Sequence, residues 1–270
     1  MKNVLCVDLE DWYNANLANG IDKACAEDRV VENTKILLSI FREAQIHCTF
    51  FVLGCIAEKY PELILRIKQD GHEIASHGYA HQLIYDQTKE EFRQDIRKAK
   101  QILESIIHIP VESYRAPSWS IREETFWALE ILQEEGFKND SSIFPFRNFL
   151  YGVSGAPRFI YSTQIYSQKS FMKEFPPSTV RICGINIPFS GGFYFRFLPF
   201  WFVSGCIRAL NRKGHACIMY IHPWEIDMDT PRISLPFRDR FIQYWGIRRC
   251  RSKLVKLVTS FAFVPMNEME

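Results

Sequence analysis

The sequence lacks an excess of charge of either sign. Its 270 residues include 33 lysines and arginines against 31 aspartates and glutamates, which gives a formal net charge of +2 at pH 7. Chains that bind nucleic acid through its phosphates usually carry a clear basic excess. We therefore expect no nucleic-acid partner, and the charge balance indicates no function by itself.

Paired cysteines are missing as well. No Cys-x-x-Cys spacing occurs, and several cysteines lie in apolar stretches such as "NVLCVDL" and "ACIMYIH". This pattern favours buried, reduced thiols over a disulfide framework or a zinc framework. The eight cysteines stand at positions 6, 25, 48, 55, 183, 206, 217 and 250.

Long apolar runs are also absent. No stretch of 18 apolar residues could span a membrane, and acidic residues appear by position 8, too early for the apolar middle of a signal peptide. We therefore expect a cytoplasmic protein. The basic ending "RRCRSKLVKL" could lie on anionic lipid as an amphipathic helix, so peripheral membrane contact is an alternative to a solvated terminal helix. The oligomeric state is left open.

Short β-branched or aromatic runs alternate with amphipathic helical patterns in the first half of the chain. This alternation predicts parallel strands joined by crossover helices. With 47% hydrophobic residues and no linker, repeat or low-complexity tract, the chain can bury one large core. We predict a single α/β domain, an irregular barrel. The expected strands are 3–9, 48–54, 73–77, 113–117 and 217–220, and the expected helices are 32–45, 56–71, 88–107 and 122–136.

A pair of histidines follows one of these strands. The stretch "GHEIASHGYAH" places His77 at the carboxyl end of the predicted strand 73–77 and His81 in the connection after it. Parallel barrels carry their functional groups at these strand ends. A His-x-x-x-His pair can converge on one metal ion, although two surface histidines in a polar loop would give the same pattern.

Three carboxylates stand at the end of the first predicted strand. Asp8, Glu10 and Asp11 follow the apolar run in "CVDLEDWY". Carboxylates crowded at a buried strand end repel one another unless a cation or a proton is shared among them. The alternative is an acidic cluster at a helix N-terminus, where negative charge is favourable.

Further polar residues follow other predicted strands. Arg115 in "SYRAPSW" could hold a carboxylate in its ionised form, or it could make an ordinary surface ion pair. His222 in "CIMYIHPWEID" emerges where a strand ends, a position that suits either a structural or a catalytic imidazole. Asp140 in "FKNDSSIFP" could cap a turn or support an imidazole.

Taken together, these stretches occur in a recognisable order. "VDLEDW", "TFFVLG", "GHEIASHGYAH", "YRAPSWS", "DSSIFP" and "IHPWE" resemble the motifs of the NodB-homology polysaccharide deacetylases, carbohydrate esterase family four. Within that family the chain is similar to the exopolysaccharide-locus and allantoinase-like branch. The resemblance covers residues 3–225 and implies a (β/α)7 barrel. Residues 226–270 would then be a C-terminal helical extension of one domain spanning 1–270.

The resemblance assigns a role to each metal-site residue. The second acid of the opening motif would bind a divalent metal with His77 and His81. The family commonly has two adjacent aspartates in this motif, whereas this chain has a different spacing of acids. Strand alternation puts Glu10 on the same face as Asp8, so we predict Glu10 as the ligand, with Asp11 as the alternative. A second departure is Gly78, where the family usually has serine or threonine.

The resemblance also implies the catalytic groups. Asp8 would be the general base, and Arg115 would keep it ionised. His222 would protonate the leaving amine, with Asp140 as a candidate partner that tunes its pKa.

These roles predict hydrolysis of an N-acetyl group from an amino sugar of a polysaccharide, or of its lipid-linked or oligosaccharide precursor. Two imidazoles and one carboxylate suit zinc, although cobalt, nickel, manganese or iron would also fit. One alternative is a metal-independent allantoinase-like amidohydrolase that acts on a small ureide. The other is a carbohydrate-binding barrel without catalysis.

One further segment is unusually aromatic. The stretch "GGFYFRFLPFWF", residues 191–202, could stack against sugar rings. A buried helix or loop beneath the barrel is the alternative and is favoured by the usual burial of such residues. A lipid-linked substrate would give these aromatic side chains a reason to face a membrane.

Overall fold

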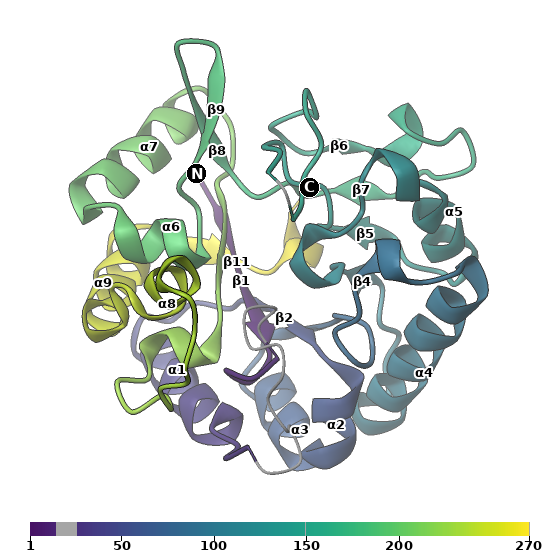
Figure 1. The fold of residues 1–270 in the computed structure, drawn as a ribbon, viewed down its shortest axis with the longest axis horizontal. Helices are drawn as coiled ribbons and strands as arrows, with labels where there is room; N and C mark the ends of the chain where they lie inside the picture. Colours follow the sequence, from purple (N-terminus) through teal and green to yellow (C-terminus); the bar gives the residue numbers. More distant parts are fainter. Residues whose placement is uncertain (15–25, 149, 270) are drawn as a thin grey trace.

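A curved sheet of mostly parallel strands forms the centre of the computed structural model, which describes residues 1–14, 26–148 and 150–269 (Figure 1). The strands follow the order β10-β1-β2-β3-β4-β5-β7-β6, and β11 also pairs with β1. The strands of this sheet are β1 (Asn3–Leu9), β2 (Thr49–Val52), β3 (Glu73–Ser76), β4 (Ser113–Tyr114), β5 (Asn139–Asp140), β6 (Tyr161–Ser162), β7 (Lys173–Glu174), β10 (Ile218–Ile221) and β11 (Phe263–Val264).

Every neighbouring pair from β10 to β7 along this order is parallel, whereas β6 runs antiparallel to β7. The predicted irregular α/β barrel is therefore confirmed. Backbone hydrogen bonds of the chain after β7 connect the two sides of the curved sheet: the Phe175 N–H donates to the Asp140 carbonyl, and the Ser178 N–H donates to the Ile218 carbonyl. A separate hairpin, β8 (Thr179–Ile182) and β9 (Ile185–Pro188), projects from this segment (Figure 1).

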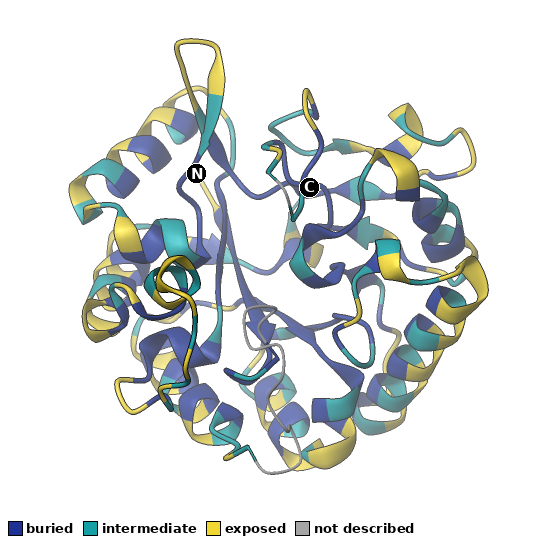
Figure 2. Ribbon diagram, viewed as in Figure 1, coloured by how far each residue is buried: buried dark blue, intermediate teal, exposed yellow. Residues whose placement is uncertain are grey.

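Helices cover the outside of the sheet, with their buried faces turned toward the strands (Figure 2). The α-helices are α1 (Val30–Glu43), α2 (Gly54–Lys59), α3 (Pro61–Gln69), α4 (Lys89–Ile107), α5 (Trp127–Glu134), α6 (Gly192–Phe197), α7 (Phe200–Arg212), α8 (Phe237–Tyr244) and α9 (Ile247–Ser260). Short 3-10 turns are η2 (Ile84–Asp86), η3 (Pro117–Trp119), η4 (Glu123–Thr125), η5 (Thr163–Ile165), η6 (Pro223–Ile226) and η7 (Met266–Glu268).

Helix α4 shows how the sequence determines one of these elements. Thr88 caps its first turn through a capping box with Glu91, in which each side chain bonds the backbone of the other residue. The buried side chains recur every three or four positions and form one apolar face: Phe92, Ile96, Ala99, Leu103 and Ile107. This face packs on the sheet, and the polar remainder faces solvent.

Two sequence predictions are wrong in detail. Residues 56–71, expected as one helix, form α2 and α3, because Pro61 cannot continue a helix but suits the first position of a new one. The segment 226–270 is not only helical, because β11 returns to the sheet beside β1. The domain assignment of 1–270 stays a prediction.

The described cysteines are largely buried, as expected. Five of them, Cys6, Cys48, Cys206, Cys217 and Cys250, are buried free thiols, and Cys55 is half-buried. Cys183, at the turn of the β8–β9 hairpin, is an exposed exception. Cys25 lies outside the described residues.

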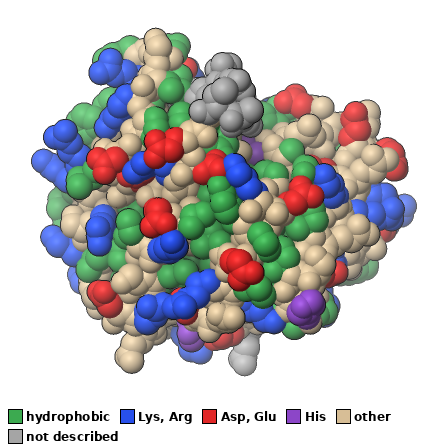
Figure 3. Space-filling model, turned by 90° about the horizontal axis from the view of Figure 1, so that it is seen from below, with side chains coloured by type: hydrophobic (Ala, Val, Ile, Leu, Met, Phe, Trp, Pro, Cys, Tyr) green, Lys and Arg blue, Asp and Glu red, His purple; other side chains and the backbone are tan. Residues whose placement is uncertain are grey.

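Basic and acidic side chains are interspersed on the face shown in Figure 3, in keeping with the small net charge. None of the described helices has the length and apolar character needed to cross a membrane. The expected amphipathic ending corresponds to α9, which buries Cys250, Leu254 and Leu257 and exposes Arg248 and Arg251. Its contact with lipid stays a prediction.

A buried imidazole at the amino ends of β2 and β3 makes the fold sensitive to acid. Burial, with a smaller contribution from His47, lowers the pKa of His72 to about 4, and His72 Nδ1 accepts a hydrogen bond from the Cys48 N–H at 3.1 Å. The unfolded chain binds this proton near pH 6.5, so stability present at pH 7 is lost as the pH falls toward 4.

Between pH 7 and pH 5, wild type should lose roughly 1–2 kcal/mol more unfolding free energy than His72→Gln does. Urea unfolding of both proteins at the two pH values measures this difference. An equal loss in wild type and variant would show that His72 does not titrate in this range.

Candidate active site

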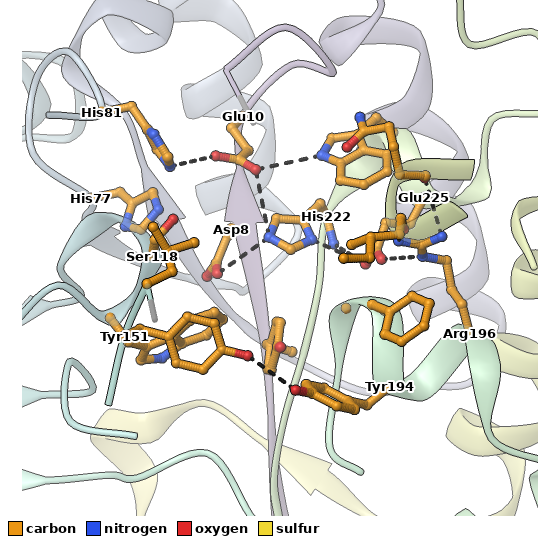
Figure 4. A pocket seen from close by; sticks show the side chains of 18 residues that line it. Asp8, Glu10, His77, His81, Ser118, Tyr151, Tyr194, Arg196, His222 and Glu225 are labelled. Carbon is orange, nitrogen blue, oxygen red and sulfur yellow. Dashed lines mark hydrogen bonds and ion pairs between the residues drawn. The ribbon is translucent and has the colours of Figure 1, made fainter. Parts of the chain in front are cut away.

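The carboxyl ends of β1 and β3 and the residue after β10 meet at one cavity of about 170 Å³. Parallel neighbours end at the same edge of a sheet, so residues far apart in the sequence are brought together there. Figure 4 shows their side chains pointing into this cavity. Asp8, Glu10, His77, His81 and His222 all line it.

Glu10, His77 and His81 form one cluster of candidate metal ligands. One ligand atom from each of the three side chains lies within 4.8 Å of the other two, and the Oε2 atom of Glu10 is 2.8 Å from Nε2 of His81. His77 Nδ1 lies 2.7 Å from the Arg115 carbonyl oxygen. An N–H donated there leaves His77 Nε2 free to act as a ligand.

The charges of His77 and Glu10 suit a cation. Burial, strengthened by the neighbouring His81, lowers the pKa of His77 to about 3, which keeps the ring neutral. Burial opposes the charge on Glu10, but His81 and His222 outweigh it and lower the pKa of this carboxyl. Glu10 is 3% exposed, and its Oε2 has no hydrogen-bond partner of proper geometry within the described part of the chain, although His81 Nε2 lies 2.8 Å from it.

A buried carboxylate oxygen in this state is costly without a positive partner. Two imidazoles and one carboxylate are a usual ligand set for zinc and its neighbours in the first transition series. The residues therefore fit a divalent metal.

Asp11 occupies a different place. Its Oδ2 accepts hydrogen bonds from the backbone N–H groups of Arg29 at 2.7 Å and Val30 at 2.9 Å, where α1 begins. Asp11 therefore caps a helix N-terminus, which is the structural reading of the acidic cluster, whereas Glu10 faces the histidines. The geometry favours Glu10 over Asp11 as the ligand.

A pair of alanine variants separates the two acids. Glu10→Ala should lose bound metal, because one of three ligands is removed. Asp11→Ala should retain metal and lose about 1 kcal/mol of unfolding free energy, the usual cost of a lost helix cap. Metal content by mass spectrometry and urea unfolding measure the two effects, and the reversed pattern would identify Asp11 as the ligand.

Asp8 and Arg115 form a buried ion pair beside the ligand cluster. Arg115 Nη1 lies 2.5 Å from Asp8 Oδ1, and neither residue is more than 2% exposed. Ser141 Oγ accepts from Arg115 Nη2 at 2.8 Å, and the guanidinium lies over the Phe51 ring. These contacts fix the orientation of the guanidinium, which holds Asp8 with its second oxygen directed toward His222.

His222 lies on the other side of Asp8. Its Nε2 is 3.8 Å from Asp8 Oδ2 and 3.5 Å from Glu10 Oε1, and its Nδ1 is 3.1 Å from Glu225 Oε2. Burial opposes protonation of the ring, but Glu225, Glu10 and Asp8 outweigh it and raise the pKa of His222 to about 9.

Glu225 and Arg196 complete this side of the site and were not predicted. Arg196 Nε donates to Glu225 Oε1 at 2.6 Å, and its other nitrogens donate to carbonyls at the end of α8. Burial opposes ionisation of Glu225, but Arg196 and His222 lower its pKa to about 2. Glu225 follows His222 by three residues in "IHPWE", so the motif itself carried this signal. Arg196 stands within the aromatic stretch 191–202, where no motif marked it as a site residue.

The expected partnership of Asp140 with His222 is wrong, because Glu225 is the carboxylate that contacts the imidazole. Asp140 is fully buried at the end of β5 and accepts a hydrogen bond from Ser142 Oγ. Burial raises the pKa of Asp140 and, together with Asp140 itself, that of the adjoining Glu174. Two such carboxyls share a proton more readily than they ionise together. Asp140 and Glu174 are therefore a buried pair in the barrel interior.

The backbone conformation and the close packing at position 78 explain why this chain has glycine there. Its φ is +74°, and an added Cβ would lie 2.8 Å from Asp95 Oδ2. That carboxylate accepts the Tyr79 N–H at 2.8 Å and so holds the loop between the two histidines. A side chain at position 78 would disturb this arrangement.

The aromatic stretch 191–202 has a mixed outcome. Phe193 and Tyr194 of α6 line the cavity, whereas Phe195 is buried and Trp201 is 73% exposed. The Tyr194 hydroxyl lies 3.5 Å from that of Tyr151, across the cavity from the metal-ligand cluster (Figure 4). Part of the stretch therefore forms a wall of the site, and part packs in the core.

Two family models match different parts of the chain, and residues 1–23, which include Asp8 and Glu10, lie in neither match. Residues 24–138 match a model described as polysaccharide deacetylase, and residues 141–270 match a domain of unknown function, DUF3473. His77, His81 and Arg115 fall in the first match, and His222 and Glu225 fall in the second. One sheet and one cavity therefore combine residues from both matched regions.

Curated relatives resemble only part of the chain. The chain is 33% identical over 101 residues to a peptidoglycan-N-acetylglucosamine deacetylase of Bacillus cereus, a match that covers 37% of either protein. It is 34% identical over 90 residues to a chitooligosaccharide deacetylase of Azorhizobium caulinodans, covering 32% of this chain and 43% of the relative. The matches thus span less than half the length of these relatives.

The fold as a whole has a solved counterpart. The crystal structure of a putative polysaccharide deacetylase from Mycobacterium smegmatis superposes with a TM-score of 0.61 at 20% identity. The superposition covers 99% of this chain and 88% of that one. The similarity thus extends across both family-model matches and shows that they share one barrel fold.

Proposed function

We propose that the chain is a metal-dependent hydrolase that removes an N-acetyl group from an amino sugar, because residues 24–138 match the polysaccharide deacetylase model. The observation that carries this proposal is the convergence of Glu10, His77 and His81 beside Asp8 in one cavity. The sequence resemblance to the exopolysaccharide-locus branch supports a polysaccharide, or its lipid-linked or oligosaccharide precursor, as the substrate.

Glu10, His77 and His81 would hold the metal, with zinc as the first candidate. A divalent cation bound there would act as a Lewis acid on the amide carbonyl and would make the attacking water more acidic. The protein's own part is to exclude other ligands from this buried position and to place a base and an acid on either side of the amide.

Asp8 is positioned to act as the general base. Arg115 donates to one of its oxygens, which leaves Oδ2 as the oxygen available to receive a proton from water. The ion pair with Arg115 fixes the orientation of the Asp8 carboxylate. As water adds to the carbonyl carbon, its proton passes to Asp8.

His222 is positioned to act as the general acid. Its raised pKa keeps the imidazole protonated at neutral pH, and Nε2 faces the cavity while Nδ1 is bonded to Glu225. Breaking the carbon–nitrogen bond requires a proton on the departing nitrogen, which His222 supplies. The products are acetate and the free amine of the sugar, and Arg196 holds Glu225 as the support of this imidazole.

The two alternatives make different predictions. A metal-independent amidohydrolase would not need the buried cluster of Glu10, His77 and His81, and a binding barrel would not need the base and acid pair. Both features are present in the same cavity, which supports the hydrolase.

The test removes metal with a chelator, restores zinc, and measures release of acetate and free amine from N-acetylchitohexaose. We expect equal amounts of both products, loss of activity on chelation and recovery with zinc. Full activity of the chelated protein on a small ureide would favour the allantoinase-like reaction. Saccharide binding without acetate release by the zinc-loaded protein would indicate a binding barrel.

A further inference from the structure

A second, larger cavity lies beside the active site and has no role in the proposed mechanism. It has a volume of about 650 Å³ and is lined by residues 145–147 and 154–159 and by residues of the β8–β9 hairpin. Among the described residues that line it, Arg147, Arg158 and Arg181 supply charge, and there is no acidic side chain.

The positive charge in this cleft is poorly compensated. Arg158 donates to the Oγ1 of Thr179 at 3.1 Å and to its carbonyl oxygen, both of which are uncharged acceptors. Arg181 Nε donates to the Gly184 carbonyl at 3.3 Å, in its own hairpin. Arg147 has one distant ion pair, 3.8 Å from Glu123.

Arg158 and Arg181 also repel each other. Burial, and then the charge of Arg181, lowers the pKa of Arg158. A carboxylate between two neighbouring guanidinium groups would relieve this repulsion and accept hydrogen bonds from both. Its absence among the described lining residues indicates that an anion from outside would be favourable here.

The cleft also offers aromatic surface. Phe146 and Phe159 line it, and Phe159 is stacked on His215 with ring centroids 3.5 Å apart, which fixes its orientation. Fixed aromatic rings beside arginine forks suit a sugar ring that carries a carboxylate, because the ring face stacks and the carboxylate accepts paired hydrogen bonds.

The cleft adjoins the active-site cavity. Phe146 lines the cleft, Tyr194 lines the active site, and their rings contact each other with centroids 6.4 Å apart. Asn186 of β9 donates to the Pro145 carbonyl at 2.7 Å, which ties the hairpin to the same loop. A saccharide chain crossing this aromatic rim would reach both cavities.

We propose that this cleft binds an acidic sugar residue of the substrate chain, so that the enzyme acts on an anionic polysaccharide that also contains N-acetylated sugars. This inference rests on the proposed function for its biological meaning. The binding site itself can be tested separately, because a uronic-acid oligomer has no N-acetyl group to hydrolyse.

The experiment measures binding by isothermal titration calorimetry with hexagalacturonate, neutral cellohexaose and inorganic sulfate. Hexagalacturonate should bind more tightly than cellohexaose, and Arg181→Gln should weaken its binding about tenfold, the usual value of one charge-assisted contact. Arg181 is exposed and, among the described residues, donates a hydrogen bond within its own hairpin, so this variant should fold. Arg147→Gln provides a second variant, and Arg248→Gln, exposed on α9, is the matched control.

Equal binding of hexagalacturonate and cellohexaose, or binding unchanged by both cleft variants, would overturn the proposal. If sulfate bound as tightly as hexagalacturonate at the same concentration of negative charge, the cleft would be a general anion site. That result would also overturn the proposal. Absence of acetate release from N-acetylchitohexaose would count against the proposed function alone and would leave these binding results unaffected.

Discussion

His77→Ala is expected to abolish deacetylation and to reduce the bound metal to a trace. His77 supplies one of three ligands, and its Nδ1 is bonded to the carbonyl of Arg115. Loss of one imidazole leaves Glu10 and His81, a pair too weak to hold a divalent ion against dilution. The measurements are metal content after gel filtration and the initial rate of acetate release.

A matched variant at another histidine controls for general damage. His47 is exposed and lies outside the cavity, so His47→Ala should retain metal and rate. Metal content and turnover close to wild type in His77→Ala would show that the cluster is not the metal site.

Asp8→Asn should lower kcat by about 10²- to 10⁴-fold while the metal stays bound, because an amide cannot accept the proton of the attacking water. The side chain keeps an oxygen for Arg115 Nη1, which in wild type lies 2.5 Å from Asp8. The predicted pattern is therefore loss of catalysis with retained metal, which separates the base from the ligands.

The control for this variant is stability. A buried arginine facing a neutral partner can cost several kcal/mol, so urea unfolding must show that Asp8→Asn is folded at the assay temperature. A folded, metal-loaded variant with a wild-type rate would exclude Asp8 as the base.

Much of the site follows from one rule of the fold, that the carboxyl ends of parallel strands meet. Asp8 is the second-to-last residue of β1, Glu10 follows β1, His77 follows β3, and His222 follows β10. Each of these residues stands directly after an apolar run that was readable as a strand. Their convergence could be predicted without knowing any distance.

Other contacts depend on tertiary geometry that no local pattern encodes. Glu10 and Asp11 are adjacent, and only the start of α1, formed by Arg29 and Val30, shows that Asp11 turns away to cap it. The replacement of Asp140 by Glu225 as the partner of His222 depends on Arg196, which reaches across from α6. The positions of these residues in the sequence do not show which of their side chains come into contact.

The second half of the barrel was also hard to predict. Strands β5, β6 and β7 have only two residues each, too short for a hydrophobic period to be recognised. This half includes most of the region matched as a domain of unknown function. The structure gives that region a specific place, since it supplies β10, His222, Glu225 and Arg196 to the same cavity as β1 and β3.

The most direct test of the account is a crystal structure of the zinc-loaded protein with anomalous diffraction at the zinc edge. We predict a single strong peak bonded to Glu10, His77 and His81, with Asp8 and His222 on either side of the open coordination positions. An ion bound elsewhere, with the imidazoles of His77 and His81 making no bond to it, would contradict the central claim.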